Sequence, residues 1–407
     1  MSTPTQPLPV DPLPMDPMPF PAARECPFNP PTRQTELRET CPVVPIELFD
    51  GTPAWLVTRY DDFKAVMGDP RFSSKQMWRF SGSANRQAAE KAETSFTVMD
   101  PPEHGQYRRL VTRYFTIKRV ATLRPWIEQI VDAAIDALLA RESRADDLVA
   151  DFALPIASQT MCRLVGVPYD DHEWYEERAE ARSQMNGDPE VAAQAFRDLL
   201  AYMDGLITAK QDAPGDDIIS LVATELVATG ELDRDMAVAI LRLLLTAGHE
   251  TTATMIATGT FVLLTHPDQL AEIKTDRTLL PGAIEELLRY ISMLFILIRT
   301  ATEDLPVGDQ LVRKGEGVIV GPALANKDPR AFEDPDRFDI HRDNRHHVAF
   351  GFGPHQCLGQ PVARLELGIV FDRLFDRIPT LQLAVDPAEV PMKQTNLVGV
   401  GALPVTW

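Results

Sequence analysis

The chain has few cysteines for its length and a deficit of positive charge. Its 407 residues include only four cysteines, Cys26, Cys41, Cys162 and Cys357. Their spacing is wide and contains no CxxC pair, which argues against an iron–sulfur cluster and a disulfide-stabilised secreted domain. The 40 Lys and Arg against 59 Asp and Glu give a formal charge of −19. A nucleic-acid partner is not expected, because phosphate binding requires a basic surface.

The chain also lacks the marks of a signal peptide and of a membrane anchor. Its first residues are studded with proline and have neither a basic start nor an apolar core segment. The longest uncharged stretch with a hydrophobic centre, residues 251–266, is rich in threonine and shorter than the roughly 20 apolar residues of a membrane span. No GxGxxG motif follows a strand, so a nicotinamide or flavin domain is not expected. These absences predict a soluble, cytoplasmic protein.

Hydrophobic patterning predicts one mainly α-helical domain with minor antiparallel β structure. Residues 1–45 hold 13 of the 34 prolines and predict a proline-rich tail or strap, whereas 46–407 contains no linker and is expected to be a single domain. The segment 234–264 has no proline and is apolar on most faces, so it predicts a long central helix. The other expected elements are helices over 60–67, 124–141, 153–165, 190–209, 216–227, 282–290 and 363–375, a strand over 55–58 and a hairpin over 312–321.

The most specific motif surrounds Cys357, in the sequence FGFGPHQCLG over 350–359. A glycine-rich loop places this cysteine just before a predicted helix, whose N-terminus and free N–H groups favour a thiolate. A single thiolate suits an axial position on haem iron better than a zinc site, which requires about four ligands. A buried structural cysteine and a nucleophilic cysteine served by His355 are the alternatives. The spacing FxxGxHxCxG favours the iron ligand.

The stretch Ala247–Thr252 (AGHETT) lies within the predicted long helix. Gly248 costs that helix about 1 kcal/mol against Ala, and Thr251 and Thr252 are poor helix formers. Such a run predicts a local distortion with a hydroxyl available beside opened carbonyls. Close packing of two helices across small residues is the alternative interpretation.

Charged residues elsewhere in the chain predict buried ion pairs. Glu286 and Arg289 (ELLR) are three residues apart on one helix face, and a solvated surface pair is the alternative. The family resemblance described below implies that Arg337 of the segment PDRF joins this pair, and the three would then form a buried network that supports the Cys357 loop. Arg299 follows a mostly apolar run and, if buried, requires an anionic partner such as a haem carboxylate.

These motifs, together with Asp100–His104 (DPPEH) and Arg108, resemble in type and order those of the cytochrome P450 superfamily, from about Leu48 to the C-terminus. The resemblance implies a triangular prism with the long helix over haem b, and Cys357 as the axial thiolate. It also implies that Thr251 hydrogen-bonds dioxygen over the iron and that Glu250 connects to a proton relay. The residues implied to contact haem are His104, Arg108, Ala247, Gly248, Arg299, Phe350, His355, Cys357 and Gly359.

The resemblance further implies where the substrate binds. The implied pocket residues are Leu244, Ala247, Leu294, Phe295, Leu397 and Val398, together with the segments 75–97 and 183–195. Within the first segment, Met77, Trp78, Phe80 and Phe96 are expected to close over a bulky ligand. These residues are mostly apolar, as expected for a pocket above a cofactor.

The implied activity is that of a monooxygenase, which hydroxylates or epoxidises a small, largely apolar molecule in secondary metabolism or xenobiotic oxidation. A monomer is expected, with electrons supplied by a separate ferredoxin and ferredoxin reductase. Arg342, Arg345, Arg364 and Arg373 are candidates for docking the ferredoxin, and the alternative is that they are solvated or held in salt bridges. Two alternatives remain open. The segments 48–62, 86–91 and 147–168 also resemble the nitric oxide reductase branch, which uses NADH directly. The second alternative is a haem-binding protein without catalytic turnover. The presence of both Glu250 and Thr251 favours a monooxygenase over these two alternatives.

Overall fold

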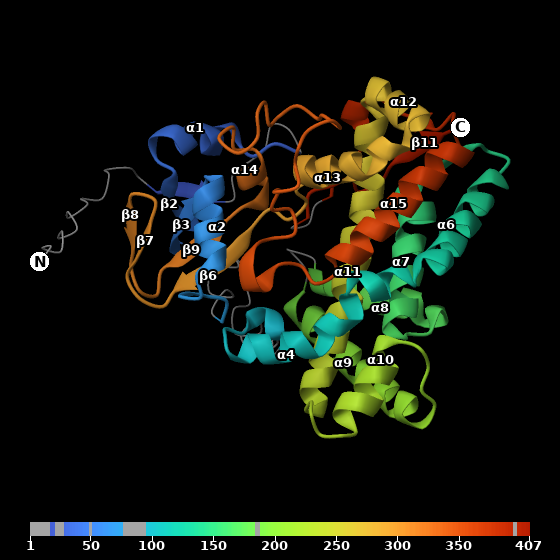
Figure 1. Ribbon diagram of the computed structural model, residues 1–407, viewed down its shortest axis with the longest axis horizontal. Coiled ribbons are helices and arrows are strands. Elements are labelled where there is room, and N and C mark those ends of the chain that lie inside the picture. The colour runs from blue at the N-terminus through green and yellow to red at the C-terminus, as the bar shows by residue number, and fades with distance from the viewer. Residues whose placement is uncertain (1–16, 21–27, 49–50, 76–94, 184–187, 394–396) are drawn as a thin grey trace, which may run out of the picture.

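Most helices occupy one side of the molecule, and the main sheet occupies the other together with a few shorter helices, within a body of roughly triangular outline (Figure 1). The computed structural model describes residues 17–20, 28–48, 51–75, 95–183, 188–393 and 397–407. Its α-helices are α1 (Thr32–Thr40), α2 (Tyr60–Gly68), α4 (Glu103–Thr112), α5 (Ile117–Ala121), α6 (Arg124–Leu139), α7 (Leu154–Val165), α8 (His172–Ser183), α9 (Pro189–Asp212), α10 (Ile218–Leu221), α11 (Arg234–Leu264), α12 (Pro267–Thr275), α13 (Leu280–Ile291), α14 (Pro322–Asn326) and α15 (Gln360–Arg377). Its strands are β1 (Met18–Phe20), β2 (Val43–Leu48), β3 (Pro53–Val57), β4 (Phe72–Ser73), β5 (Ala145–Asp147), β6 (Leu297–Ala301), β7 (Leu305–Val307), β8 (Gln310–Val312), β9 (Gly317–Val320), β10 (Gln382–Leu383) and β11 (Pro404–Thr406). The expected fold class, mainly α with minor β structure, is confirmed.

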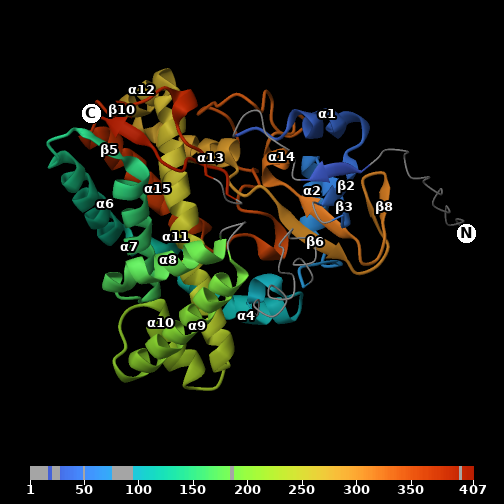
Figure 2. The ribbon, with the colours of Figure 1, turned by 180° about the vertical axis from the view of Figure 1, so that it is seen from behind.

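The helix α11 runs through the centre of the helical side, and the front and back views show other helices around it (Figures 1 and 2). It packs against α7, α9 and α15. Asp233 caps its N-terminus, where the carboxylate accepts from the N–H groups of Asp235 and Met236. Buried side chains come from nearly every turn between Ala237 and Leu263, so the helix is enclosed on most faces. The helix predicted over 234–264 is confirmed at both ends.

The main sheet has six strands in the order β1-β2-β3-β9-β6-β4. The pairs β2–β3, β9–β6 and β6–β4 are antiparallel, whereas β1–β2 and β3–β9 are parallel. The hairpin predicted over 312–321 is wrong, because β8 pairs with β7 in a separate sheet while β9 lies between β3 and β6. All four residues of β9 are buried, as expected for a strand that is covered on both faces.

The described part of segment 1–45 belongs to the body of the protein. The helix α1 follows Pro31, and β1 pairs with β2 at the edge of the main sheet. The guanidinium of Arg38 is 4% exposed and donates to the carbonyls of Thr58, Leu324 and Lys327 within 2.9 Å. Residue 45, where the boundary is predicted, lies within β2, so this strand contains residues from both sides of it. Proline is frequent up to Pro31 but then absent as far as Pro42, which leaves room for a helix.

Candidate active site around Cys357

The Cys357 loop leads directly into α15. Gly351 and Gly353 have φ angles of 75° and 73°, in the left-handed region that favours glycine. A side chain at Gly353 would also collide with the backbone at the end of α2. The N–H of Cys357 donates to the carbonyl of Phe350 over 2.8 Å, which closes the loop. Gly359 caps α15, and backbone N–H groups at the start of this helix donate to the sulfur.

The Cys357 sulfur faces an opening inside the protein. The side chain is accessible to solvent, yet burial among protein atoms is the largest influence on its thiol and raises the pKa of that thiol. Both observations hold if the side chain borders an internal space instead of the outer surface. The N–H groups of Gly359 and Gln360 and the guanidinium groups of Arg108 and Arg364 oppose this rise in the pKa, because they stabilise a thiolate.

Four basic side chains gather beside this loop: His104 and Arg108 of α4, Arg299 of β6, and His355. The rings of His104 and His355 lie 4.0 Å apart between centroids, and Nη2 of Arg108 donates to the carbonyl of Gln356 over 2.5 Å. Arg299 is 5% exposed, and burial lowers the pKa of its guanidinium to about 10. Burial and the positive charges of the other three lower the pKa of His355 to about 3. Among the described residues, the negative charge near this cluster is therefore too small to balance its positive charge.

The residues of this cluster fit haem, whose iron takes a thiolate as axial ligand and whose propionates are carboxylates. The oxygens of Asp100 accept from Ser73 Oγ at 2.5 Å and from the N–H of Ser74 at 2.8 Å, so this carboxylate is already engaged. Nε2 of His104 is buried and has no hydrogen-bond partner within the described part of the chain. A ligand carboxylate would satisfy this nitrogen and neutralise the buried guanidinium of Arg299.

One face of α11 opens to an accessible space halfway along the helix. Ala247 is exposed and Thr251 is half-buried, whereas the turns on either side are mostly buried. The two residues are four apart, so their side chains share one helix face. Thr251 Oγ1 donates to the carbonyl of Ala247 over 2.7 Å. The side chain of Glu250 is 30% exposed, and its Oε1 lies 2.9 Å from Nζ of Lys393. The structure thus brings three predicted residues, Ala247, Glu250 and Thr251, to this opening.

Gly248 serves the packing of α11 against α7. A Cβ at this position would collide with the sulfur of Met161 in α7. The helix α11 continues through 247–252, so the distortion predicted there is not found, and the hydroxyl of Thr251 bonds within the helix. The alternative interpretation of this stretch, close packing of two helices, therefore explains why residue 248 is a glycine. The predicted contact of Gly248 with haem is not needed for this explanation.

Glu286 and Arg289 of α13 form a fully buried ion pair. Nε and Nη2 of Arg289 lie 2.8 Å from the two carboxylate oxygens of Glu286, and neither side chain is exposed. The prediction that the side chain of Arg337 completes this network is wrong, because it is 65% exposed and pairs with Asp339. Arg342 takes that place, with its Nε 3.2 Å from Oε1 of Glu286. Arg337 contributes its carbonyl oxygen, which accepts from Arg289 and Arg342.

Three of the four arginines expected to dock a ferredoxin are engaged within the protein. Arg342 is buried in the network just described, with its side chain 9% exposed. Arg364 pairs with an acidic residue of α13 at 2.6 Å, and Arg373 pairs with one of α6 at 2.9 Å. The side chain of Arg345 is 92% exposed. The predicted docking set therefore needs correction, since of these four Arg345 alone presents its charge fully to solvent.

Part of the predicted substrate pocket comes together in the structure. Leu294 forms a β-bridge with Leu397, and Val398 follows directly in the chain. Leu397 and Val398 are 6% and 9% exposed, while Leu294 is half-buried. Leu244 is 8% exposed and packs in the cluster that α11 shares with α7 and α9. Leu244 thus lies on α11 itself, and Val398 packs in the core cluster that also contains residues of α11.

The predicted aromatic residues have different surroundings from those expected. Phe295 stacks on Phe20 with ring centroids 5.7 Å apart, so its place in the predicted pocket needs correction: the ring packs toward β1. Phe96 is 3% exposed and lies beside His104, with ring centroids 6.1 Å apart. Met77, Trp78 and Phe80 lie outside the described residues, as do most of 75–97 and part of 183–195.

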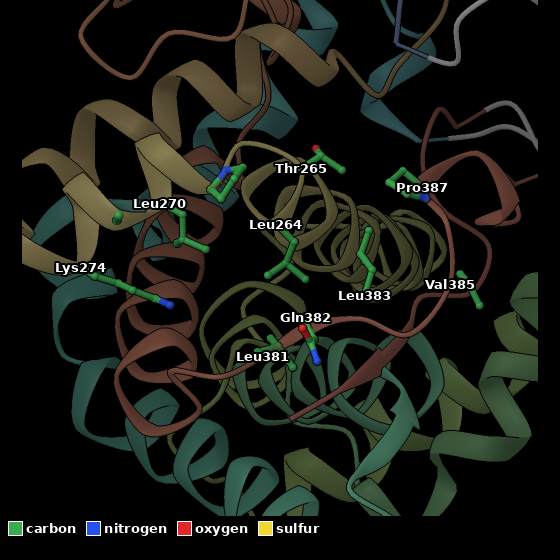
Figure 3. Close-up of a pocket in the computed structure, with 11 residues that line it drawn as sticks. Leu264, Thr265, Leu270, Lys274, Leu381, Gln382, Leu383, Val385 and Pro387 are labelled. Atoms are coloured by element: carbon green, nitrogen blue, oxygen red, sulfur yellow. The ribbon is translucent and has the colours of Figure 1, made fainter.

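A cavity of about 520 Å³ lies at the C-terminal end of α11 (Figure 3). Its apolar walls are Leu264 of α11, Leu270 of α12, Leu381 and, in β10, Leu383, and Lys274 lies at its edge. None of the residues predicted to bind haem or substrate lines this cavity, so it is separate from the site around Cys357.

Comparison with known proteins gives consistent matches over nearly the whole chain. A family model described as cytochrome P450 matches residues 185–403. Vitamin D3 dihydroxylase of Streptomyces griseolus is 45% identical over 95% of this chain and 96% of its own. The 20-oxo-5-O-mycaminosyltylactone 23-monooxygenase of Streptomyces fradiae is 41% identical over 95% of this chain and 92% of its own. The crystal structure of mycinamicin VIII C21 methyl hydroxylase from Micromonospora griseorubida, bound to mycinamicin VIII, matches with a TM-score of 0.91 and 39% identity, covering 96% of this chain and 100% of that one.

Among the helices of the described ranges, none is both long enough and apolar enough to cross a membrane.

Proposed function

The chain belongs to the cytochrome P450 family of monooxygenases, and from this premise we propose that it hydroxylates a C–H bond of a bulky, mostly apolar organic molecule. Haem would lie between Cys357 and the open face of α11, and the thiolate of Cys357 would bind its iron. One observation carries this proposal: Cys357 and Ala247 are both accessible, although Ala247 lies on the enclosed helix α11 and Cys357 lies just before α15, which packs against α11.

The basic cluster would hold the carboxylates of haem, which supplies the reductive activation of dioxygen when it is bound. Arg108 and Arg299 provide positive charge. The pKa of His355 is lowered to about 3, so its ring is neutral near pH 7 and acts as a hydrogen-bonding group. His104 offers the buried nitrogen that lacks a partner among the described residues. Phe350 and Gly359, predicted to contact haem, flank the sulfur by closing the loop and capping α15.

Protons are the second requirement of the reaction. A C–H bond, dioxygen, two electrons and two protons give an alcohol and water, so two protons must reach the space in front of Cys357. The Glu250 carboxylate, 30% exposed, would take protons from the surface side. The Thr251 hydroxyl, which donates to the carbonyl of Ala247, would turn its hydrogen bond toward the opening. These two side chains are the residues that we propose as catalytic.

The substrate class follows from the apolar walls and from the relatives. Leu244, Leu294, Leu397 and Val398 offer hydrocarbon surface, which favours a largely apolar ligand. The relatives are named for action on vitamin D3, a mycaminosyltylactone and mycinamicin VIII. We propose a ligand of similar bulk, with a ring system that is mostly hydrocarbon.

Electrons are proposed to come from a separate ferredoxin that docks on the side of α4. Arg108 of this helix contacts the carbonyl of Gln356, next to Cys357, so α4 is a short route to the sulfur. Arg109 of α4, Lys118 of α5 and Arg345 are exposed and would attract an acidic partner despite the negative total charge.

The test is a spectral titration of the ferric holoprotein with macrolides, vitamin D3 and smaller terpenoids, followed by turnover with ferredoxin, reductase and isotopically labelled dioxygen. A shift from low to high spin and one labelled oxygen in the product support the proposal. A product that carries oxygen from water instead, or turnover of nitric oxide with NADH alone, would contradict it.

A further inference from the structure

The carboxylate of Glu285, beside Glu286 on α13, joins two segments that flank Cys357. Its Oε1 lies 2.6 Å from Nε of Arg364 and its Oε2 lies 2.9 Å from Nη2, a two-pronged contact. The same Oε2 lies 3.0 Å from Nε2 of His347. Burial raises the pKa of Glu285, but the hydrogen bonds from His347 and Arg364 outweigh it and lower the pKa to about 2. Glu285 is therefore a carboxylate at any working pH.

His347 connects Glu285 to the segment before the loop. Its side chain is 2% exposed, and its Nδ1 accepts from the N–H of Ala349 over 3.2 Å. Since Nδ1 accepts, the ring proton lies on Nε2 and points at Glu285. Ala349 directly precedes Phe350, whose carbonyl accepts the N–H of Cys357.

Arg364 connects Glu285 to the segment after the loop. It lies in the second turn of α15, and its Nη1 donates to Oε1 of Gln360 over 2.9 Å. Its guanidinium carbon lies 4.7 Å from the centre of the Phe350 ring. Arg364, which Glu285 binds, therefore covers the ring of Phe350. The ring of His347, the other partner of Glu285, lies 6.2 Å from the Phe350 ring between centroids.

We propose that Glu285 is a positioning residue for the thiolate, holding both flanks of the Cys357 loop through His347 and Arg364 and balancing the charge of Arg364 near the iron. The inference rests on the proposed function, because it takes Cys357 as the haem ligand. The neighbouring Glu286 already has its oxygens occupied by Arg289, Arg342 and Asn344, so it does not duplicate this role.

The sign of the charge effect separates positioning from ordinary structural support. Glu285→Gln leaves the cation of Arg364 uncompensated, which favours the less positive, reduced iron and moves the haem reduction potential to more positive values. Arg364→Gln leaves the anion of Glu285 uncompensated and moves the potential to more negative values. A side chain that only maintains the fold would not move the two potentials in opposite directions.

The experiment compares wild type, Glu285→Gln, Glu285→Asp and Arg364→Gln as holoproteins. The control is Glu272→Gln, which loses a similar carboxylate–histidine contact of 2.8 Å, to His341, on the exposed surface of α12. The measurements are the reduction potential, from a spectroelectrochemical titration, and the rate at which the reduced carbon monoxide complex changes from its thiolate to its thiol spectrum in mild urea. We expect Glu285→Gln to convert about tenfold faster, as for the loss of one charge-assisted hydrogen bond, and Glu285→Asp to restore part of the difference.

Equal potentials and conversion rates in Glu285→Gln and the Glu272→Gln control would overturn the inference, as would a shift of both potentials in one direction. If Glu285→Gln does not retain haem, Arg364→Gln carries the test, and an unchanged potential there would overturn it. A wild-type protein without a thiolate spectrum would overturn the proposed function itself.

Discussion

Nζ of Lys393 lies 2.9 Å from Oε1 of Glu250, which ties a segment near the C-terminus to the open face of the central helix. The Lys393 side chain is 16% exposed and that of Glu250 is 30% exposed, so the pair lies between the interior and the surface. An ion pair at the boundary between interior and surface limits the movement of the Glu250 carboxylate, while water can still reach this carboxylate. The pair therefore fixes the acid that we propose as the proton source.

Glu250→Gln should lower the turnover rate by about 10²-fold, because an amide cannot relay protons. The solvent deuterium isotope effect on turnover should rise at the same time, since proton delivery becomes limiting. Lys393→Met is the matched variant: it removes the partner but leaves the carboxylate, so turnover should stay within a few-fold of wild type. A loss in Lys393→Met as large as in Glu250→Gln would show that the ion pair, and not the acid, is required.

Thr251→Ala should separate electron consumption from product formation. The hydroxyl lies on the open face of α11, and without it dioxygen would be reduced with release of hydrogen peroxide instead of alcohol. Product formed per reduced nucleotide and peroxide released measure this directly. Thr260→Ala is the control, because Thr260 makes the same bond to the carbonyl four residues earlier but is fully buried. Unchanged coupling in Thr251→Ala would remove Thr251 from the proton path.

Arg342→Ala should destabilise the protein by about 3–5 kcal/mol, because it leaves the carboxylate of Glu286 buried with one of its cationic partners removed. Arg337→Ala should change the free energy of unfolding by less than about 1 kcal/mol, since that side chain is 65% exposed and its carbonyl remains. Urea unfolding of both variants measures the difference. The reverse order of effects would show that Arg337 is the buried partner after all.

Glu366 of α15 predicts a pH dependence of stability. The side chain is buried, and burial raises the pKa of its carboxyl to about 8 from an ordinary value of 4.5. Between these values the folded state holds a proton that the unfolded state has released, so stability falls as the pH rises through this window. Glu366→Gln cannot ionise and should lose this slope, with a gain over wild type of up to ~5 kcal/mol above pH 8. Parallel unfolding curves at all pH values for the two proteins would contradict the assignment.

Local sequence patterns predicted those parts of the site whose structure depends on residues that are close together in the chain. The loop around Cys357 depends on glycines and a following helix, and the pair Glu286–Arg289 depends on helical spacing, so both were readable in the sequence. The central helix was also readable at both ends, because no proline interrupts the apolar run over 234–264.

Partners brought together by the fold could not be predicted in this way. Arg337 and Arg342 are five residues apart in an irregular segment, and nothing local shows which of them turns its side chain inward. Likewise, no periodicity relates Lys393 to Glu250, or β9 to β3. Gly248 was ambiguous for a further reason: a helical glycine serves either a ligand or a close helix crossing, and the position of Met161 on α7 decides between them.

The spectrum of the reduced carbon monoxide complex, recorded for wild type and for Cys357→Ala, tests the central claim most directly. We predict a thiolate-type Soret band in wild type and its loss in Cys357→Ala, while Cys162→Ala, a change at a cysteine that is only 1% exposed, keeps the band. A thiolate-type band that survives in Cys357→Ala would contradict the assignment of this sulfur as the iron ligand, and with it the proposed arrangement of the site.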